Sequence, residues 1–235
     1  MVEIGPGQGA LTAPLLEKLK TLHAVELDRD LAAGLRQRFP TDDLILHSAD
    51  ALSFDFAALA QPPRLLRVIG NLPYNISTPL LFKLLDQRHA IADMHFMLQR
   101  EVVERMAAKP GSKRYGRLTV MLGLYATVER LFDIGPGAFK PAPRVWSSVV
   151  RLVPRSAPLA ELADHSVFAN LVASVFSQRR KTLANGLKRW LTKAQIVSLG
   201  LDPGVRGVTL PPETFAALAN LAHDNGITGG TDGRE

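Results

Sequence analysis

Cysteine is absent from this chain of 235 residues, so disulfide bonds and cysteine-ligated zinc sites are excluded. The six histidines are scattered and no pair of acids suggests hydrolysis, so we expect no catalytic metal. The sequence also lacks an apolar window of about 18 uncharged residues and a secretory leader with a cleavage site. We therefore expect a cytoplasmic protein with no membrane partner.

Positive charge is in excess, with 28 Lys and Arg against 22 Asp and Glu, a net charge of +6 and a pI near 9.8. Such a balance is typical of proteins that bind nucleic acid or anionic membranes, although many basic proteins bind neither. The hydrophobic fraction of 46% is ordinary for a globular protein. The length allows one main domain and a small second one.

Short apolar runs alternate with helical spacing along the first 108 residues. The strand-like runs lie at residues 2–4, 23–28, 44–47, 65–69 and 94–99. This alternation predicts an α/β fold, a Rossmann-like parallel sheet with helices on both faces. Since the carboxyl ends of parallel strands meet at one edge, we expect the residues there to form a site: Glu3, Gly5, Glu26, Asp50 and Asn71.

The first strand is followed by a glycine-rich turn, Gly5-Pro6-Gly7-Gln8-Gly9-Ala10. The turn fits the dinucleotide fingerprint, with Glu26 placed 21 residues after Gly5 to accept hydrogen bonds from ribose hydroxyls. It fits the turn of S-adenosylmethionine-dependent methyltransferases equally well, and a purely structural strand-to-helix turn is the third reading. Asp50 is read either as an acceptor for an adenine amine or as a helix cap.

The segment Asn71-Leu72-Pro73-Tyr74 follows the fourth strand. An exocyclic amine of a nucleobase is a poor nucleophile because its lone pair is delocalised into the ring. The side-chain oxygen of Asn71 and the carbonyl of Leu72 are suitable acceptors for its two N–H groups. Pro73 stiffens the turn and Tyr74 offers a face on which a flipped base can stack. The segment therefore indicates a site for a base amine, although such a turn can also be structural.

The second half of the chain changes in character. Strands are predicted at residues 128–134 and 147–153, then a linker at 154–158 and helices from Phe168 onward. The basic run Arg179, Arg180, Lys181 and Lys188 lies in these helices. One continuous helix would put Arg179 and Arg180 near its apolar face, so we predict a break near 177–180 that turns both outward. The run is then either an RNA-binding surface or a solvated face.

Five segments, VEIGPGQGALT, AVELD, ADAL, NLPYNIST and FKPAPRVWS, follow one another in the order and rough spacing of the ribosomal RNA adenine dimethyltransferases. The chain resembles this family from Val2 to about residue 226, and it is most similar to the small-subunit members. The resemblance implies S-adenosylmethionine as methyl donor, bound by Glu3, Gly5, Gly7, Glu26, Leu27, Asp50, Ala51 and Asn71.

The resemblance also implies that Phe139 stacks on the target adenine opposite Tyr74, although an aromatic between prolines can also be a core plug. The implied catalytic residues are Asn71, Leu72, Pro73, Tyr74 and Phe139. The implied partner is small-subunit ribosomal RNA within the small ribosomal subunit, contacted by Lys113, Arg114, Arg144, Arg179, Arg180, Lys181 and Lys188.

One departure from the family is the start of the chain. Members carry an N-terminal arm with a Gln-Asn-Phe-Leu segment that closes over the cofactor, and Met1 here is followed directly by the end of a strand. We therefore expect a catalytic domain at 1–154 that is incomplete at its N-terminus, a helical RNA-binding domain at 159–226 and a flexible tail at 227–235. We expect weak cofactor binding, and a monomer if the arm is restored.

The predicted activity is dimethylation of adenine N6 in small-subunit ribosomal RNA during ribosome assembly. Three alternatives stay open at this point. A large-subunit adenine N6-methyltransferase shares every cofactor motif, and an assembly factor can dock on the subunit without catalysis. A nicotinamide-dependent oxidoreductase is compatible with the glycine turn, but the chain offers no evident hydride-transfer residues.

Overall fold

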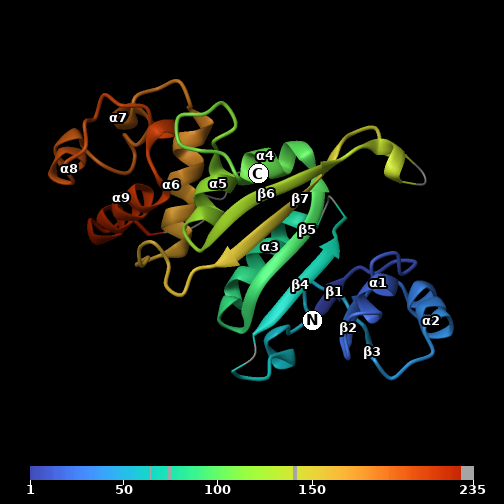
Figure 1. Cartoon of the computed structure of the whole chain (residues 1–235). Coiled ribbons are helices and arrows are strands. Elements are labelled where there is room, and N and C mark those ends of the chain that lie inside the picture. The colour runs from blue at the N-terminus through green and yellow to red at the C-terminus, as the bar shows by residue number, and fades with distance from the viewer. Residues whose placement is uncertain (64, 74–75, 140–141, 229–235) are drawn as a thin grey trace. The chain divides into compact units, whose positions relative to one another are not determined.

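The computed structural model describes residues 1–63, 65–73, 76–139 and 142–228 (Figure 1). The chain divides into two compact units. The sheet unit comprises Met1–Val103 and Thr127–Ser156, and the helical unit comprises Glu104–Ala126 and Ala157–Glu235.

The sheet has seven strands within the described residues, in the order β3-β2-β1-β4-β5-β7-β6. Strands β1 to β5 are parallel, which confirms the predicted core of the sheet. Their bounds, with those of the last two strands, are β1 Val2–Ile4, β2 Leu22–Glu26, β3 Leu44–Ser48, β4 Leu66–Asn71, β5 Ile91–Gln99, β6 Ala126–Ile134 and β7 Ser147–Pro154.

The far side of the sheet is not parallel. Strand β7 pairs antiparallel with β5, with Gln99 opposite Ser147 and Met94 opposite Leu152. The expectation of a parallel sheet therefore holds for β1 to β5, and the strand at 147–153, for which no direction was predicted, is antiparallel to β5. The physical reason is the connection, since the described part of the segment between β6 and β7 contains no crossover helix of the kind that a parallel pairing needs.

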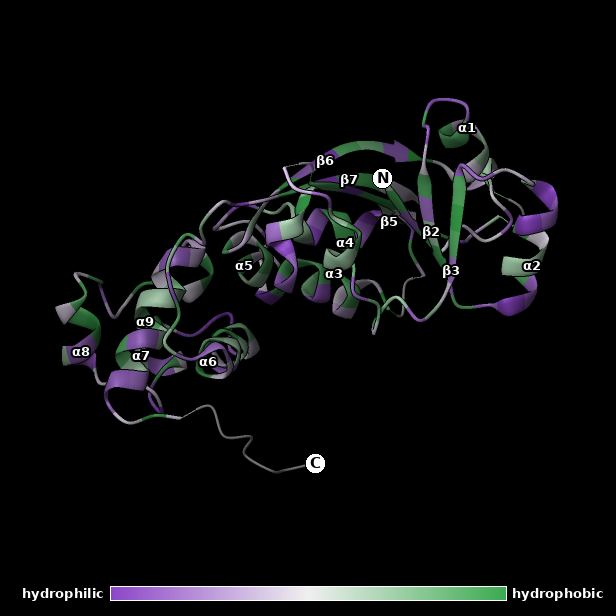
Figure 2. Cartoon of the chain, turned by 90° about the horizontal axis from the view of Figure 1, so that it is seen from below, coloured by the Kyte–Doolittle hydropathy of each residue, from purple (hydrophilic) through white to green (hydrophobic). Residues whose placement is uncertain are grey.

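Helices of the sheet unit lie on both faces of the sheet, as predicted. They are α1 Thr12–Leu16, α2 Arg29–Arg38 and α3 Ser77–Asp86, and α4 Arg100–Met106 begins in this unit and ends in the helical one. In Figure 2, α1 and α2 lie on one side of the sheet and α3 on the other. Helix α2 begins where the Asp28 side chain accepts hydrogen bonds from the backbone N–H groups of Asp30 and Leu31, at 2.8 and 3.1 Å. Helix α3 buries its leucine side chains Leu80, Leu81, Leu84 and Leu85.

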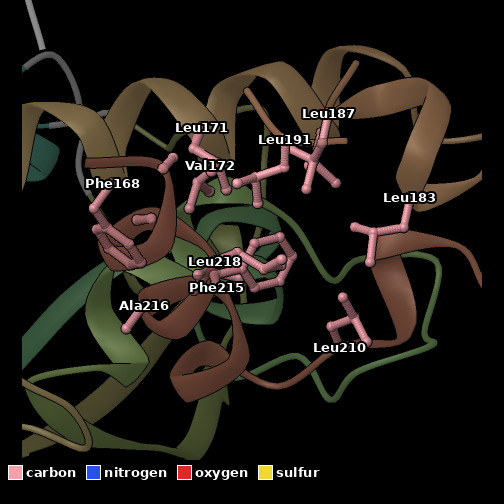
Figure 3. Close-up of a cluster of buried hydrophobic side chains, with 14 of the residues drawn as sticks. Phe168, Leu171, Val172, Leu183, Leu187, Leu191, Leu210, Phe215, Ala216 and Leu218 are labelled. Atoms are coloured by element: carbon pink, nitrogen blue, oxygen red, sulfur yellow. The ribbon is translucent and has the colours of Figure 1, made fainter. Parts of the chain in front are cut away.

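The helical unit contains α5 Arg117–Gly123, α6 His165–Ser177, α7 Leu183–Gly186, α8 Lys193–Ser198 and α9 Pro212–Asp224. Short 3-10 helices lie at Ala57–Leu59, Arg88–Ala90 and Pro136–Ala138 in the sheet unit and at Gly207–Thr209 in the helical unit. Figure 3 shows the core of the helical unit, in which side chains of α6 and α9 face one another: Phe168, Leu171, Val172, Phe215, Ala216 and Leu218. These residues are at most 1% exposed, so the unit has an apolar core of its own.

The division between the units differs from the predicted boundary at residue 154. Residues 104–126, which we expected in the catalytic domain, belong to the helical unit. Tyr115 is buried in the helical core and its hydroxyl donates to the carbonyl oxygen of Leu210 at 2.7 Å. The Gly111 N–H also donates to the Val208 carbonyl oxygen, at 2.8 Å. These partners are almost 100 residues away in the sequence, which local patterns cannot reveal. The predicted tail at 227–235 falls outside the described residues from 229 onward.

Candidate functional site

The carboxyl ends of four strands meet at one edge of the sheet. Ile4 is paired with Val25 of β2 on one side and with Gly70 of β4 on the other. Glu26 in turn is paired with Ser48 of β3. This register brings the predicted cluster to one edge, with its members directly at or after the strand ends: Gly5, Glu26, Asp50 and Asn71. The predicted placement of these residues is confirmed, and their roles stay predictions.

The glycine turn combines two kinds of glycine. Gly5 and Gly7 have φ angles of +64° and +57°, and a Cβ added at either would meet nothing within 4 Å. Gly9 has φ +82°, and a Cβ there would lie 2.6 Å from the Phe39 ring. The positive φ angles favour glycine throughout. The first two glycines thus leave open space beside the backbone, and the third allows the turn to pack close to α2.

Glu26 links the glycine turn to the end of β2. The side chain is 7% exposed, and its Oε2 accepts from the backbone N–H of Gly7 at 3.1 Å. Its Oε1 accepts from the N–H of Asp28 at 3.0 Å. Each carboxylate oxygen can accept a further hydrogen bond. The carboxylate is therefore fixed in position and still able to accept from two hydroxyl groups, which fits the ribose of a nucleoside cofactor.

Glu3 has a structural partner that sequence reasoning missed. The residue is 1% exposed, and its Oε2 accepts from the Thr12 hydroxyl at 2.7 Å. Burial raises the pKa of Glu3, and the hydrogen bond from Thr12 partly offsets this. The spacing between Glu3 at the end of a strand and Thr12 at the start of α1 was the available signal. Glu3 thus connects β1 to α1, and direct contact with a cofactor stays a prediction.

Asp50 has features of both predicted roles, a helix cap and an acceptor for an adenine amine. Its Oδ1 accepts from the Leu52 N–H at 2.9 Å, and its carbonyl oxygen accepts from the N–H groups of Ser53 and Phe54 at 3.0 Å each. This is a capped turn, yet the residue is exposed, and within the described residues the hydrogen bonds leave its Oδ2 available. Leu27 is 68% exposed and Ala51 is 7% exposed, so an uncovered apolar side chain stands beside Glu26.

The Asn71-Leu72-Pro73 segment leaves the sheet at the same edge. Asn71, paired with Met97 of β5, is exposed, whereas the Leu72 side chain is 1% exposed. Anchoring of the Leu72 side chain fixes the direction of its carbonyl, and the exposed Pro73 restricts the backbone of the preceding Leu72 to extended conformations. The Pro73 carbonyl oxygen accepts from the Ile76 N–H at 3.3 Å. The arrangement suits a pair of rigid acceptors.

The two predicted stacking residues are not both described. Tyr74 lies outside the described residues, as do the two residues that follow Phe139. Phe139 is half-buried and comes directly after the 3-10 helix at Pro136–Ala138, where its N–H donates to the Pro136 carbonyl oxygen at 3.2 Å. Stacking of an adenine between Tyr74 and Phe139 stays a prediction.

The predicted RNA-binding residues fall in both units. Arg144 belongs to the sheet unit and is exposed. The helical unit holds the others, of which Lys113, Arg180, Lys181 and Lys188 are also exposed. Arg114 forms an ion pair with Glu104, with 3.2 Å between Nη2 and Oε2. Most of the predicted basic side chains are therefore available to solvent and to a phosphate backbone.

The prediction that Arg179 and Arg180 both turn outward is wrong for Arg179. Helix α6 does end at Ser177, as predicted, and α7 begins at Leu183. Arg180 is exposed, but the guanidinium of Arg179 donates to the backbone carbonyl oxygens of Tyr115 and of Lys113, the latter at 3.1 Å. It also lies 5.7 Å from the centroid of the Phe176 ring. Arg179 holds the loop at 113–115 in place because that loop offers carbonyl acceptors, so its side chain is committed within the protein.

In the described part of the chain, no three His, Asp or Glu side chains gather in a way that would hold a metal ion. The same residues include no helix long and apolar enough to span a bilayer.

Residues 1–224 match the sequence model of the family described as ribosomal RNA adenine dimethylase. The chain belongs to this family. Two curated relatives share one name. The ribosomal RNA small subunit methyltransferase A of Nitrosococcus oceani is 58% identical over 219 residues, 93% of this chain and 83% of the relative. The protein of the same name from Aromatoleum aromaticum is 53% identical, over 94% of this chain and 82% of the relative.

Solved structures of the family have the same fold. A dimethyladenosine transferase from Plasmodium falciparum is 26% identical and superposes with a TM-score of 0.80, covering 96% of this chain and 90% of that protein. The 23S rRNA methyltransferase ErmE is 25% identical with a TM-score of 0.69, covering 94% and 90%. The α/β methyltransferase fold expected from the sequence is therefore confirmed, helical part included.

Proposed function

We propose that the protein transfers methyl groups from S-adenosylmethionine to the N6 amine of adenine in small-subunit ribosomal RNA, giving N6,N6-dimethyladenosine during ribosome assembly. The observation that carries the proposal is the edge of the sheet where Glu26 fixes the glycine turn beside the acceptors of Asn71 and Leu72. Membership of the adenine dimethylase family and the names of the curated relatives support the substrate.

The cofactor residues fit S-adenosylmethionine by their chemistry. Glu26 accepts hydrogen bonds from the ribose hydroxyls, and the free oxygen of Asp50 accepts from the adenine amine of the cofactor. Leu27 and Ala51 provide apolar surface for the adenosine, and Gly5 and Gly7 leave room for close approach of the backbone. When bound, S-adenosylmethionine supplies an electrophilic methyl group on a positively charged sulfur.

The target amine is held by two oxygens. The Oδ1 of Asn71 and the carbonyl oxygen of Leu72 accept from its two N–H groups, which draws the nitrogen toward tetrahedral geometry and frees its lone pair. Tyr74 and Phe139 stack on the two faces of the adenine. The contribution of the chain is mainly orientation, which can account for a large part of the rate of a transfer reaction. Solvent takes the proton after each transfer.

RNA is held by the exposed basic side chains. Lys113, Arg180, Lys181 and Lys188 neutralise phosphates on the helical unit, and Arg144 does so on the sheet unit. Arg179 acts indirectly in this scheme, because its guanidinium positions the loop that carries Lys113. The partner is the small ribosomal subunit rather than free nucleoside.

Transfer of labelled methyl groups to unmethylated small ribosomal subunits tests the proposal, with nucleoside analysis of the product. We expect dimethyladenosine from the wild-type chain and a loss of kcat by roughly 10²–10³ in Asn71→Ala, since one positioned hydrogen bond at the reacting group is removed. Asn185→Ala, an exposed asparagine of α7, is the matched control and keeps full activity.

The outcomes separate the alternatives. Methylated adenosine mapped only to the large subunit would favour the activity in the name of ErmE. Binding to the small subunit without any transfer, unchanged in Asn71→Ala, would favour an assembly factor. Full activity of Asn71→Ala would overturn the assigned role of the segment at 71–73.

A further inference from the structure

The helical unit contains an open hollow of about 450 Å³ that the proposed chemistry does not use. One wall is the outer side of α6, which presents Asn170, Ser174 and Ser177. The other lining residues are Arg189 and Trp190, after α7, and Ile227, after α9. The volume lies within the range of roughly 300–1,000 Å³ found for small-ligand sites.

Trp190 presents a firmly held aromatic ring to the hollow. Its side chain packs against the apolar core of the helical unit and also lines the hollow. The backbone N–H of Trp190 donates to the Leu187 carbonyl oxygen at 2.7 Å, and Leu187 is itself fully buried. The indole is thus held by the core and still presents surface to the hollow. An aromatic ring held in this way loses little conformational entropy when a flat ligand stacks on it.

Most of the wall residues come from a stretch of the chain whose charges are of one sign. The sequence contains no acidic residue between Asp164 and Asp202, a range that includes every wall residue except Ile227. The same range holds six basic residues: Arg179, Arg180, Lys181, Lys188, Arg189 and Lys193. Arg189 is exposed and lines the hollow. This excess of positive charge favours an anionic ligand over a cationic or uncharged one.

We propose that this hollow binds one unpaired nucleotide of RNA, with its base stacked on Trp190 and its phosphate at Arg189. Asn170 and Ser177 supply hydrogen-bonding groups for the sugar and the base edge. An aromatic platform beside a guanidinium is the usual means of holding single-stranded nucleic acid. The inference deepens the proposed function, because it gives the helical unit a site for a nucleotide remote in sequence from the Asn71 segment.

Intrinsic fluorescence measures the stacking directly. The chain has two tryptophans, so Trp146→Phe leaves Trp190 as the only one. We expect an eight-nucleotide oligouridylate or oligoadenylate to quench the fluorescence of this variant in a saturable way. By anisotropy of the labelled oligonucleotide, Trp190→Leu should weaken binding roughly 10-fold, since stacking is lost while apolar packing is kept. Trp190→Phe should bind within about 3-fold of the wild type, because a ring is retained.

Two controls separate stacking from charge and from misfolding. Arg189→Gln should weaken binding and reduce its salt dependence, whereas Lys20→Gln, an exposed lysine of the sheet unit, should do neither. Thermal melting of each variant shows whether the core of the helical unit is intact. If Trp190→Leu melts early, Asn170→Arg, which fills the hollow from an exposed helix side, tests the same site without touching the core.

The inference is overturned if Trp190 fluorescence is not quenched, if Trp190→Leu binds like the wild type, or if polyglutamate quenches as well as RNA. In methyl transfer, Trp190→Leu should raise the KM for small subunits with little change in kcat. Quenching without any methyl transfer would refute the proposed function and leave the RNA site standing. Methyl transfer by the wild type, together with unchanged RNA binding by Trp190→Leu, would support the proposed function and refute the nucleotide site.

Discussion

Gly70 of β4 is paired with Ile4 of β1 and lies tightly against it. A Cβ at this position would lie 2.6 Å from the carbonyl oxygen of Ile4, a backbone atom that cannot move without shifting β1. Asn71 follows directly, so the close approach of the two strands sets the position of the predicted amine acceptor. The requirement for glycine is steric here, in contrast to Gly5 and Gly7, whose positive φ angles and open surroundings make it conformational.

Gly70→Ala is therefore expected to destabilise the fold by about 3 kcal/mol, the upper part of the range for overpacking a core. Gly34→Ala is the matched substitution, because Gly34 lies inside α2 and a Cβ there would meet nothing within 4 Å. It should stabilise by about 0.5–1 kcal/mol through helix propensity. Urea unfolding of both variants measures the difference. Equal effects of the two substitutions would contradict the close approach of β4 to β1.

A pair of histidines lies on β2 and β3, the two neighbouring strands at one edge of the sheet. The Nδ1 of His23 and the Nε2 of His47 are 3.1 Å apart and the rings are stacked, with Phe54 beside His47. Burial lowers the pKa of both histidines, and the neighbouring His47 further lowers that of His23. Only one proton can lie between the two nitrogens, so protonation of both rings breaks the hydrogen bond.

Stability is expected to fall as pH decreases through the range below about 6.5. Because the folded-state pKa of each histidine lies under its unfolded value, the unfolded chain binds more protons in that range and gains from acid. The loss is at most about 1.4 kcal/mol per pH unit for each histidine. Unfolding curves at pH 7, 6 and 5 measure it.

A double variant, His23→Gln with His47→Gln, should flatten this dependence on pH, whereas His89→Gln, at an exposed position, should leave it unchanged. Identical pH profiles for the double variant and the wild type would refute the role of the pair.

At the scale of the molecule, the exposed basic side chains of the helical unit are expected to control the salt dependence of RNA binding. Each phosphate contact contributes about 0.7–0.9 to the slope of log K against log salt. Replacing Arg180, Lys181 and Lys188 together by Gln should reduce the slope by about 2–3, measured with small-subunit RNA between 50 and 200 mM salt. A slope that stays at the wild-type value would place the RNA elsewhere.

Arg179→Gln is a contrasting case, since this arginine is bound to the carbonyls of Lys113 and Tyr115. It should lower the melting temperature of the protein while the salt slope changes less than in the triple variant. Loss of a charged hydrogen-bond donor that serves two carbonyls costs about 1.5–3 kcal/mol.

The amino-acid sequence by itself determined the alternation of β1 to β5 with their helices, the glycine turn, and the meeting of Gly5, Glu26, Asp50 and Asn71 at one edge. These features follow from local causes: the period of apolar residues, the conformational freedom of glycine and the geometry common to all parallel sheets. The break after Ser177 was also predictable, because a continuous helix would have placed arginines near its apolar face.

Only the tertiary structure decided the antiparallel pairing of β7, the membership of residues 104–126 in the helical unit, the hydrogen bond between Glu3 and Thr12, and the commitment of Arg179 to backbone carbonyls. The hollow beside Trp190 belongs to the same group, since its walls come from residues near 170, 190 and 227. In each case the partner is supplied by a different element. Local propensity describes what a segment can form, and long-range packing determines which of the available acceptors, faces and rings that segment meets.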